Sequence, residues 1–208
     1  MSLLPPLDRL NTFMKRTTKL TWLAIACSAA LSACGYNGVV DKDEAVKASW
    51  SEVENQYQRR ADLIPNLVNT VKGAAKFESD TLARVVEARA SATSIKVDAS
   101  IIDDPVRLEK FEKAQANLSG ALSRLLATVE NYPDLKASAA YRDLMAQLEG
   151  TENRIAVARQ RHIVNVADYN AYVQKFPTNL GARIRGKSAR PTFSATTPGA
   201  DRAPEVKF

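Results

Sequence analysis

Residues 104–129 read DPVRLEKFEKAQANLSGALSRLLATV, and this stretch decides the fold of the chain. Its large apolar residues recur at steps of three, four and seven, which places them along one face of an α-helix. The stripe consists of Leu108, Phe111, Leu118, Leu122, Leu125 and Val129. Asp104 and Pro105 come just before it and are typical of a helix cap and a first-turn proline. A stripe of this kind must be covered by other helices.

Two similar stripes precede this helix. The first begins near Asp41 and the second ends near Ala92, and a loop over 94–103 comes next. Their apolar positions are Val46, Trp50, Val53, Tyr57, Ala61 and Ile64, then Leu67, Val71, Ala74, Leu82, Val85 and Ala88. Pro65 disfavours a helical conformation at the residue before it, so we expect a break at residues 62–64. One long helix kinked at Pro65 is the alternative.

A long helix is expected after Asn131-Tyr132-Pro133, from about Lys136 to Lys175. Its candidate buried residues are Leu144, Leu148, Ile155, Ala158, Tyr169, Val173 and Phe176. Nothing alternates with a period of two over a useful length, which argues against strands. The sequence therefore predicts an all-α fold, an antiparallel four-helix bundle with long helices over residues 41–177.

The N-terminal residues have the features of an export signal. Residues 19–35 form a short apolar run after the basic Lys15, Arg16 and Lys19, and small residues end it. The run is too short for a typical membrane span of about 20 residues. Leu31-Ser32-Ala33-Cys34 resembles the lipobox of bacterial lipoproteins, which implies cleavage before Cys34 and a lipid on its thiol. A single N-terminal transmembrane helix is the alternative.

The segment boundaries depend on this leader. Residues 1–33 are the expected signal peptide, with Met14 as the expected true start, and residues 34–40 are a lipidated linker. Cys27 lies within the leader, so only Cys34 remains and no intramolecular disulfide can form. Residues 178–208 mix prolines, glycines and threonines with basic residues and lack apolar periodicity, so we expect a basic, mostly disordered tail.

Charge is distributed unevenly along the chain, whose formal net charge is +6. The leader carries four basic groups and one acidic group, and residues 178–208 carry six and two, which leaves the body close to neutral. Proteins that bind nucleic acid usually carry a basic face on the folded body. We therefore expect no nucleic-acid partner.

Three polar residues fall on the apolar stripes. Glu78 lies on the second, Gln115 on the third and Thr151 on the fourth, at similar distances from the connecting bends. In an antiparallel bundle they should meet at one level, facing Trp50. The structural interpretation is a buried polar layer that fixes the register of the helices, since a buried carboxylate must be paired or protonated. The alternative is a small-ligand pocket or a general acid at Glu78.

The sequence gives little support for a catalytic or metal-binding site elsewhere. His162 is the only histidine, and a partly buried, hydrogen-bonded side chain is the preferred interpretation. Arg59 and Arg60 are interpreted as surface groups near the first bend. With one histidine and no free cysteine, the usual zinc ligands are missing. We expect no catalytic residue, no metal and no cofactor.

Several short motifs follow one another along the chain. They are Tyr36-Asn37, residues 59–68 (RRADLIPNLV), residues 71–73 (VKG), residues 88–90 (ARA), residues 130–137 (ENYPDLKA), residues 151–156 (TENRIA), residues 168–170 (DYN) and Phe176-Pro177. In order and spacing this series resembles the LemA family. The resemblance implies a four-helix bundle outside the cytoplasmic membrane with no established enzymatic activity. Arg161-His162-Ile163 departs from the aromatic pattern of the family, and a lipid on Cys34 replaces its usual transmembrane helix.

The functional expectation is a non-enzymatic envelope lipoprotein that acts as a scaffold or adaptor for unidentified protein partners. It faces the periplasm or exterior, and Gly35 after the lipid cysteine favours the outer membrane where one exists. The rival is an envelope receptor or hydrolase using Glu78. Self-association through an exposed Trp50 or Tyr57 is a third possibility.

Overall fold

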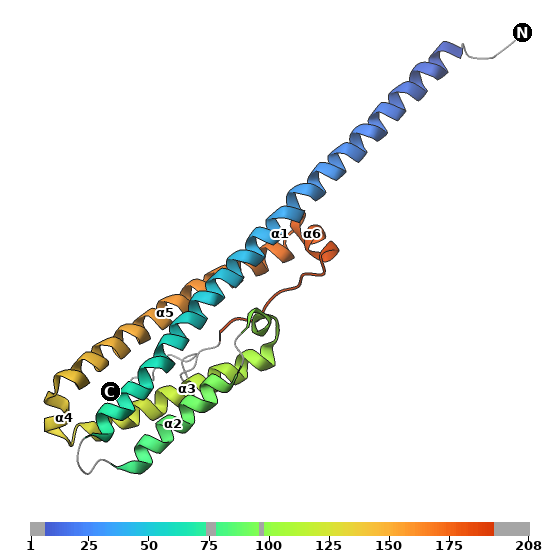
Figure 1. The fold of residues 1–208 in the computed structure, drawn as a ribbon. Coiled ribbons are helices and arrows are strands. Elements are labelled where there is room, and N and C mark those ends of the chain that lie inside the picture. The colour runs from blue at the N-terminus through green and yellow to red at the C-terminus, as the bar shows by residue number, and fades with distance from the viewer. Residues whose placement is uncertain (1–6, 74–77, 96–97, 194–208) are drawn as a thin grey trace, which may run out of the picture. The chain divides into compact units, whose positions relative to one another are not determined.

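The computed structural model describes residues 7–73, 78–95 and 98–193, with the backbone alone for residues 7–36 and 99. These residues form helices and no strand (Figure 1). The helices are α1 (Leu7–Lys72), α2 (Ser79–Ser94), α3 (Pro105–Val129), α4 (Pro133–Ala137), α5 (Ala139–Gln174) and α6 (Thr178–Ile184), with a 3-10 helix η1 (Ala99–Asp103). The predicted all-α class is confirmed.

The chain divides into two compact units, which we describe separately. The larger unit contains residues 44–167 and the segment that starts at Arg190. Within it, the long helices α1, α2, α3 and α5 pack around an apolar core and form the four-helix bundle (Figure 1). The core includes Ile64, Leu67, Val71, Val85, Leu118, Leu122, Leu125, Val129, Leu135, Tyr141 and Leu148.

Helix α3 agrees closely with the sequence prediction. All six residues of its predicted stripe are buried. Its N-cap is Asp104, whose carboxylate accepts hydrogen bonds from the backbone nitrogens of Val106 at 2.9 Å and Arg107 at 3.1 Å. Pro105 occupies the first turn, where its missing N–H leaves no intrahelical bond unmade. The capping arrangement therefore fixes where α3 begins.

The expected break at residues 62–64 is wrong, because α1 continues through Pro65 to Lys72. Proline at 65 has no N–H to donate to the carbonyl of Ala61, four residues earlier. The guanidinium of Arg89 on α2 donates to that carbonyl instead, from Nε at 2.7 Å. A neighbouring helix thus satisfies the oxygen that proline leaves free, and the kinked single helix is the correct alternative.

The continuation of α1 to Lys72 displaces the start of the second bundle helix. Gly73 comes directly after the last residue of α1, and α2 starts only at Ser79. Residues 65–92 are therefore not one helix, and Glu78 is the N-cap residue of α2 rather than a mid-helix position. The loop expected over 94–103 contains η1, in which Ile101 and Ile102 are buried.

The smaller unit contains α1 up to Asp43 together with residues 168–189. Its described side chains start at Asn37, and Val39, Tyr169, Val173 and Ala182 are buried. Ion pairs join Lys42 to Asp168 at 3.4 Å and Lys187 to Asp43 at 3.1 Å. Residues 34–40, expected as a linker, belong to α1. Among the described residues, no helix is both long and apolar enough to span a bilayer.

The expected disordered tail is wrong for residues 178–193. Residues 178–184 form α6, which the absence of an apolar period did not indicate. Further on, in the larger unit, Arg190 and Phe193 are buried. The guanidinium of Arg190 donates to the carboxylate of Asp103 at 2.6 Å, which anchors this segment next to η1. Residues 194–208 lie outside the described part.

Candidate functional site

The three residues of the predicted polar layer are not brought together. Glu78 is exposed, and its only described hydrogen bond is local, from Thr81 Oγ1 at 3.5 Å. Its expected burial was wrong because the position was counted along a helix that does not exist there. Gln115 and Thr151 are buried on α3 and α5. The hydroxyl of Thr151 donates to the Gln147 carbonyl of its own helix at 2.7 Å.

Arg60 on α1, rather than Glu78, is the charged centre of the bundle. Its side chain is almost fully buried, contrary to the surface position expected from the sequence. One terminal nitrogen donates to Ser119 Oγ at 2.9 Å and to Glu152 Oε1 at 2.7 Å, and the other donates to Gln115 Oε1. The guanidinium thereby joins α1 to α3 and α5. Among the described residues, its Nε has no hydrogen-bond partner.

A second ion pair lies next to this network. Arg159 on α5 and Glu112 on α3 approach to 3.5 Å, and both side chains are mostly buried. Tyr57 packs beside them, with the Arg60 guanidinium 5.1 Å from the centre of its ring. Burial raises the pKa of the Tyr57 phenol, and the positive charge of Arg159 opposes that rise. At neutral pH the phenol is therefore protonated and can donate a hydrogen bond.

These charged residues line a recess of about 290 Å³. Its lining includes Arg60, Arg159, Glu112 and Glu152, so two cations face two carboxylates. Since Arg60 pairs with Glu152 and Arg159 with Glu112, the charges of the recess compensate one another. An ionic ligand would have to displace an existing ion pair. The arrangement therefore favours a structural polar layer.

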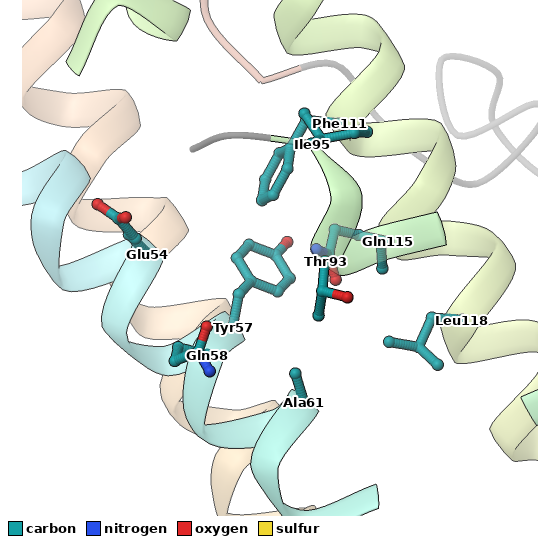
Figure 2. A pocket seen from close by; sticks show the side chains of 10 residues that line it. Glu54, Tyr57, Gln58, Ala61, Thr93, Ile95, Phe111, Gln115 and Leu118 are labelled. Carbon is teal, nitrogen blue, oxygen red and sulfur yellow. The ribbon is translucent and has the colours of Figure 1, made fainter. Parts of the chain in front are cut away.

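A separate pocket of about 180 Å³ opens between α1, α2 and α3 (Figure 2). Tyr57 contributes from α1, Thr93 from α2, and Phe111 and Gln115 from α3. Pockets that enclose small organic ligands usually measure about 300–1,000 Å³. This pocket is smaller, and it suits waters or a ligand of few atoms.

His162 on α5 lies in an aromatic environment near the C-terminal segment. It is buried, and Trp50 and Phe193 have ring centres 5.3 and 5.7 Å from its own. Ser49 Oγ lies 3.0 Å from His162 Nδ1 and also 2.8 Å from the Val46 carbonyl, to which it donates. The hydroxyl and the ring nitrogen share this hydrogen bond, and the tautomer of the imidazole sets which of them donates.

The pKa of His162 is lowered to about 4, mainly by burial and also by the positive charge of Arg190, while a hydrogen bond to the Val46 backbone opposes the change. The imidazole is therefore neutral at pH 7. Phe193 stacks on Trp50 with ring centres 5.8 Å apart, and the Arg159 guanidinium lies 4.4 Å from the Phe193 ring centre. Because aromatic rings surround the histidine, its side chain has a packing role rather than a catalytic one.

Three further features were considered from the sequence: the lipid cysteine, a metal site and a self-association patch. Cys34 lies on the helical backbone of α1, and its side chain is outside the described residues. Within the described part of the chain, no group of three His, Cys, Asp or Glu side chains is placed to hold a metal ion. Trp50 and Tyr57 are both buried, so they do not form the exposed patch considered for self-association.

The position of Arg60 carried a sequence signal that the helix assignment hid. Steps of three and four from Tyr57 reach residues 60, 64, 67 and 71 in turn, and all of these are buried. Once α1 is continuous, Arg60 falls on its apolar stripe. Its polar partners lie on α3 and α5, and the sequence alone does not determine how these helices are rotated toward α1.

Comparison with known proteins gives consistent results. Residues 49–208 match the sequence model of the LemA family. The magnetosome protein MamQ of Magnetospirillum gryphiswaldense is 28% identical over 167 residues, which cover 73% of this chain and 61% of the relative. The magnetosome protein MamQ 2 of Paramagnetospirillum magneticum is 26% identical over 79% of this chain and 66% of its own length.

The protein LemA of Metamycoplasma hominis is 28% identical over 144 residues, which cover 69% of this chain and 61% of that relative. The chain thus spans 61 to 66% of the length of these curated relatives.

Proposed function

The chain belongs to the LemA family, and we propose that it is a lipoprotein tethered to a membrane of the cell envelope through Cys34. We further propose that it acts as a non-enzymatic adaptor for protein partners. The observation that carries the adaptor role is the Arg60 network. Its guanidinium joins three helices through partners that belong to the same chain. Such a layer specifies how the helices pack and leaves their outer faces available for proteins.

The tether rests on the leader and on Cys34. Residues 15–35 combine a basic start, a short apolar run and a small-residue ending before a cysteine. One acyl chain binds a membrane only marginally, whereas two or more hold a protein firmly. A multiply acylated Cys34 would keep the bundle at one surface throughout its life.

The rival function used Glu78 as an acid or ligand group in a buried layer. That version fails because Glu78 is exposed at the start of α2. The pocket beside Gln115 is also small for an organic ligand, at about 180 Å³. Both facts count against a receptor or hydrolase that uses this layer.

Mass spectrometry of the membrane-extracted protein tests the tether. We expect the mature chain to begin at an acylated Cys34, and a Cys34→Ser variant to keep its leader and lose the acyl mass. Cys27→Ser is the matched control, because it removes the other cysteine of the same apolar run and should be processed normally. An unmodified Cys34 in a wild-type chain that keeps its leader would refute the tether.

Crosslinking at the membrane, followed by purification, tests the adaptor role. The wild-type protein should recover the same partner proteins in repeated experiments. A Thr93→Trp variant, which fills the pocket beside Gln115, should recover them equally well. Loss of all partners in that variant alone would favour a ligand-binding pocket over an adaptor surface.

A further inference from the structure

The smaller unit carries an exposed apolar surface at its C-terminal part. Phe176 is 80% exposed, Leu180 48% and Ile184 72%. Leu180 and Ile184 are four residues apart on α6 and so lie on one face of it, and Phe176 is in the turn just before. The other exposed large apolar residues of the described chain are four valines: Val86 in α2, Val106 in α3, and Val157 and Val164 in α5. This is thus a cluster rather than scattered exposure.

Positive charge surrounds these three residues. Residues 175–187 contain Lys175, Arg183, Arg185 and Lys187 and no acidic residue. Lys175 and Arg183 are exposed, whereas Lys187 pairs with Asp43. Apolar side chains flanked by lysine and arginine are typical of elements that lie in the interface of a bilayer with anionic lipids. A purely apolar partner would not explain why lysine and arginine flank the apolar residues.

The position of this cluster within the smaller unit is equally informative. A Cβ atom added to Gly38 of α1 would come within 2.0 Å of the hydroxyl of Tyr172, so the end of α5 lies directly against Gly38. Gly38 is four residues past Cys34, about 6 Å along a helix. Phe176 comes four residues after Tyr172, and Lys187, three residues past the end of α6, pairs with Asp43 of α1. The cluster is therefore close to the expected lipid attachment.

We propose that Phe176, Leu180 and Ile184 insert into the outer part of a bilayer that contains anionic phospholipids, while Lys175 and Arg183 contact the phosphate groups. This inference rests on the proposed tether at Cys34. It adds a second, non-covalent attachment on the unit that also contains Cys34. Two attachments fix the orientation of the unit on the membrane, which a single lipid anchor does not.

Tryptophan quenching in vesicles tests this surface. Full-length protein carrying Phe176→Trp, extracted from membranes, is reconstituted into vesicles of phosphatidylcholine and phosphatidylglycerol whose acyl chains bear bromine, a contact quencher. The matched control is Val106→Trp, because Val106 is 58% exposed and belongs to the larger unit. Trp50 is buried and contributes the same background to both variants.

We expect the tryptophan introduced at position 176 to be quenched several-fold more strongly than the one at position 106. Adding Lys175→Gln and Arg183→Gln should reduce that difference, as should vesicles of phosphatidylcholine alone. Equal quenching at the two positions would overturn the proposal. So would a blue-shifted but unquenched signal at 176 in a crosslinked dimer, since a second copy of the chain would then cover the surface.

The mass of Cys34, measured on the same sample, separates the two proposals. An acylated Cys34 with no excess quenching at position 176 refutes the membrane-contacting surface and leaves the tether intact. An unmodified Cys34 refutes the tether, and the quenching contrast still decides whether the surface enters the bilayer.

Discussion

Replacing Arg89 with methionine tests how α1 tolerates Pro65. The Nε of Arg89 donates to the Ala61 carbonyl, the oxygen that a normal helix would pair with the N–H of residue 65. If Arg89 substitutes for that missing donor, its importance must depend on proline. Arg89→Met should then cost much more stability in the Pro65 protein than in a Pro65→Ala background, where a backbone N–H becomes available.

The magnitude depends on the kind of bond. Hydrogen bonds to charged groups contribute about 1.5–3 kcal/mol, and Arg89 is only half-buried, so we take the lower end, about 1.5 kcal/mol. With alanine at 65, the Ala61 carbonyl keeps a partner, and the loss should fall to about 0.5 kcal/mol. The coupling between the two positions is then about 1 kcal/mol, well above the scatter of about 0.3 kcal/mol for independent sites.

Urea unfolding of the four proteins of the cycle, monitored by circular dichroism, measures this coupling. Arg84→Met is the matched control, because Arg84 is an exposed arginine on the same helix and should lose little stability in either background. Equal losses from Arg89→Met with proline and with alanine at position 65 would show that the bond to Ala61 does not compensate for proline.

Three further outcomes are expected. Arg60→Met should lose about 2 kcal/mol of stability because it leaves the Gln115 amide buried without its partner, and adding Gln115→Leu should recover part of the loss in thermal unfolding. His162 has a folded pKa of about 4, below its usual 6.5, so the unfolded state binds a proton more readily. The stability that the neutral imidazole contributes is intact above pH 6.5 and falls by about 3 kcal/mol as the pH drops toward 4. A His162→Gln variant should therefore show a shallower pH dependence of its urea midpoint. Gly38→Ala should destabilise the protein, because the new Cβ would meet the Tyr172 hydroxyl. In a Tyr172→Ala background the same substitution should stabilise the protein by about 1 kcal/mol, because alanine favours the helix. Shifts of the melting temperature in the same direction in both backgrounds would contradict the close approach.

Periodicity and capping were enough to predict the parts of the fold that depend on local sequence. The stripe and the Asp104 cap of α3 lie where the residues indicated, because a helix's buried face and its first turn are local properties. The break at residues 62–64 was predicted wrongly by the same local reasoning. The group that allows α1 to continue, Arg89, comes from another helix, and no rule about proline in a single helix includes it.

The candidate site was harder to predict for a related reason. Gln115 is buried, but its partner is Arg60 rather than Glu78, because the layer depends on how α1 is rotated beside α3. The tail was misread because Phe193 and Arg190 are isolated anchors: one buried ring and one ion pair hold a segment without any repeating pattern.

The Arg60 network also bears on how the larger unit responds to mechanical load. A helix that slides past its neighbours must move about one turn, 5.4 Å, to reach the next packing position. Bonds of 2.9 Å to Ser119 and 2.7 Å to Glu152 cannot survive such a shift. A pull on α1 would therefore have to break both bonds before this helix could slide past α3 and α5.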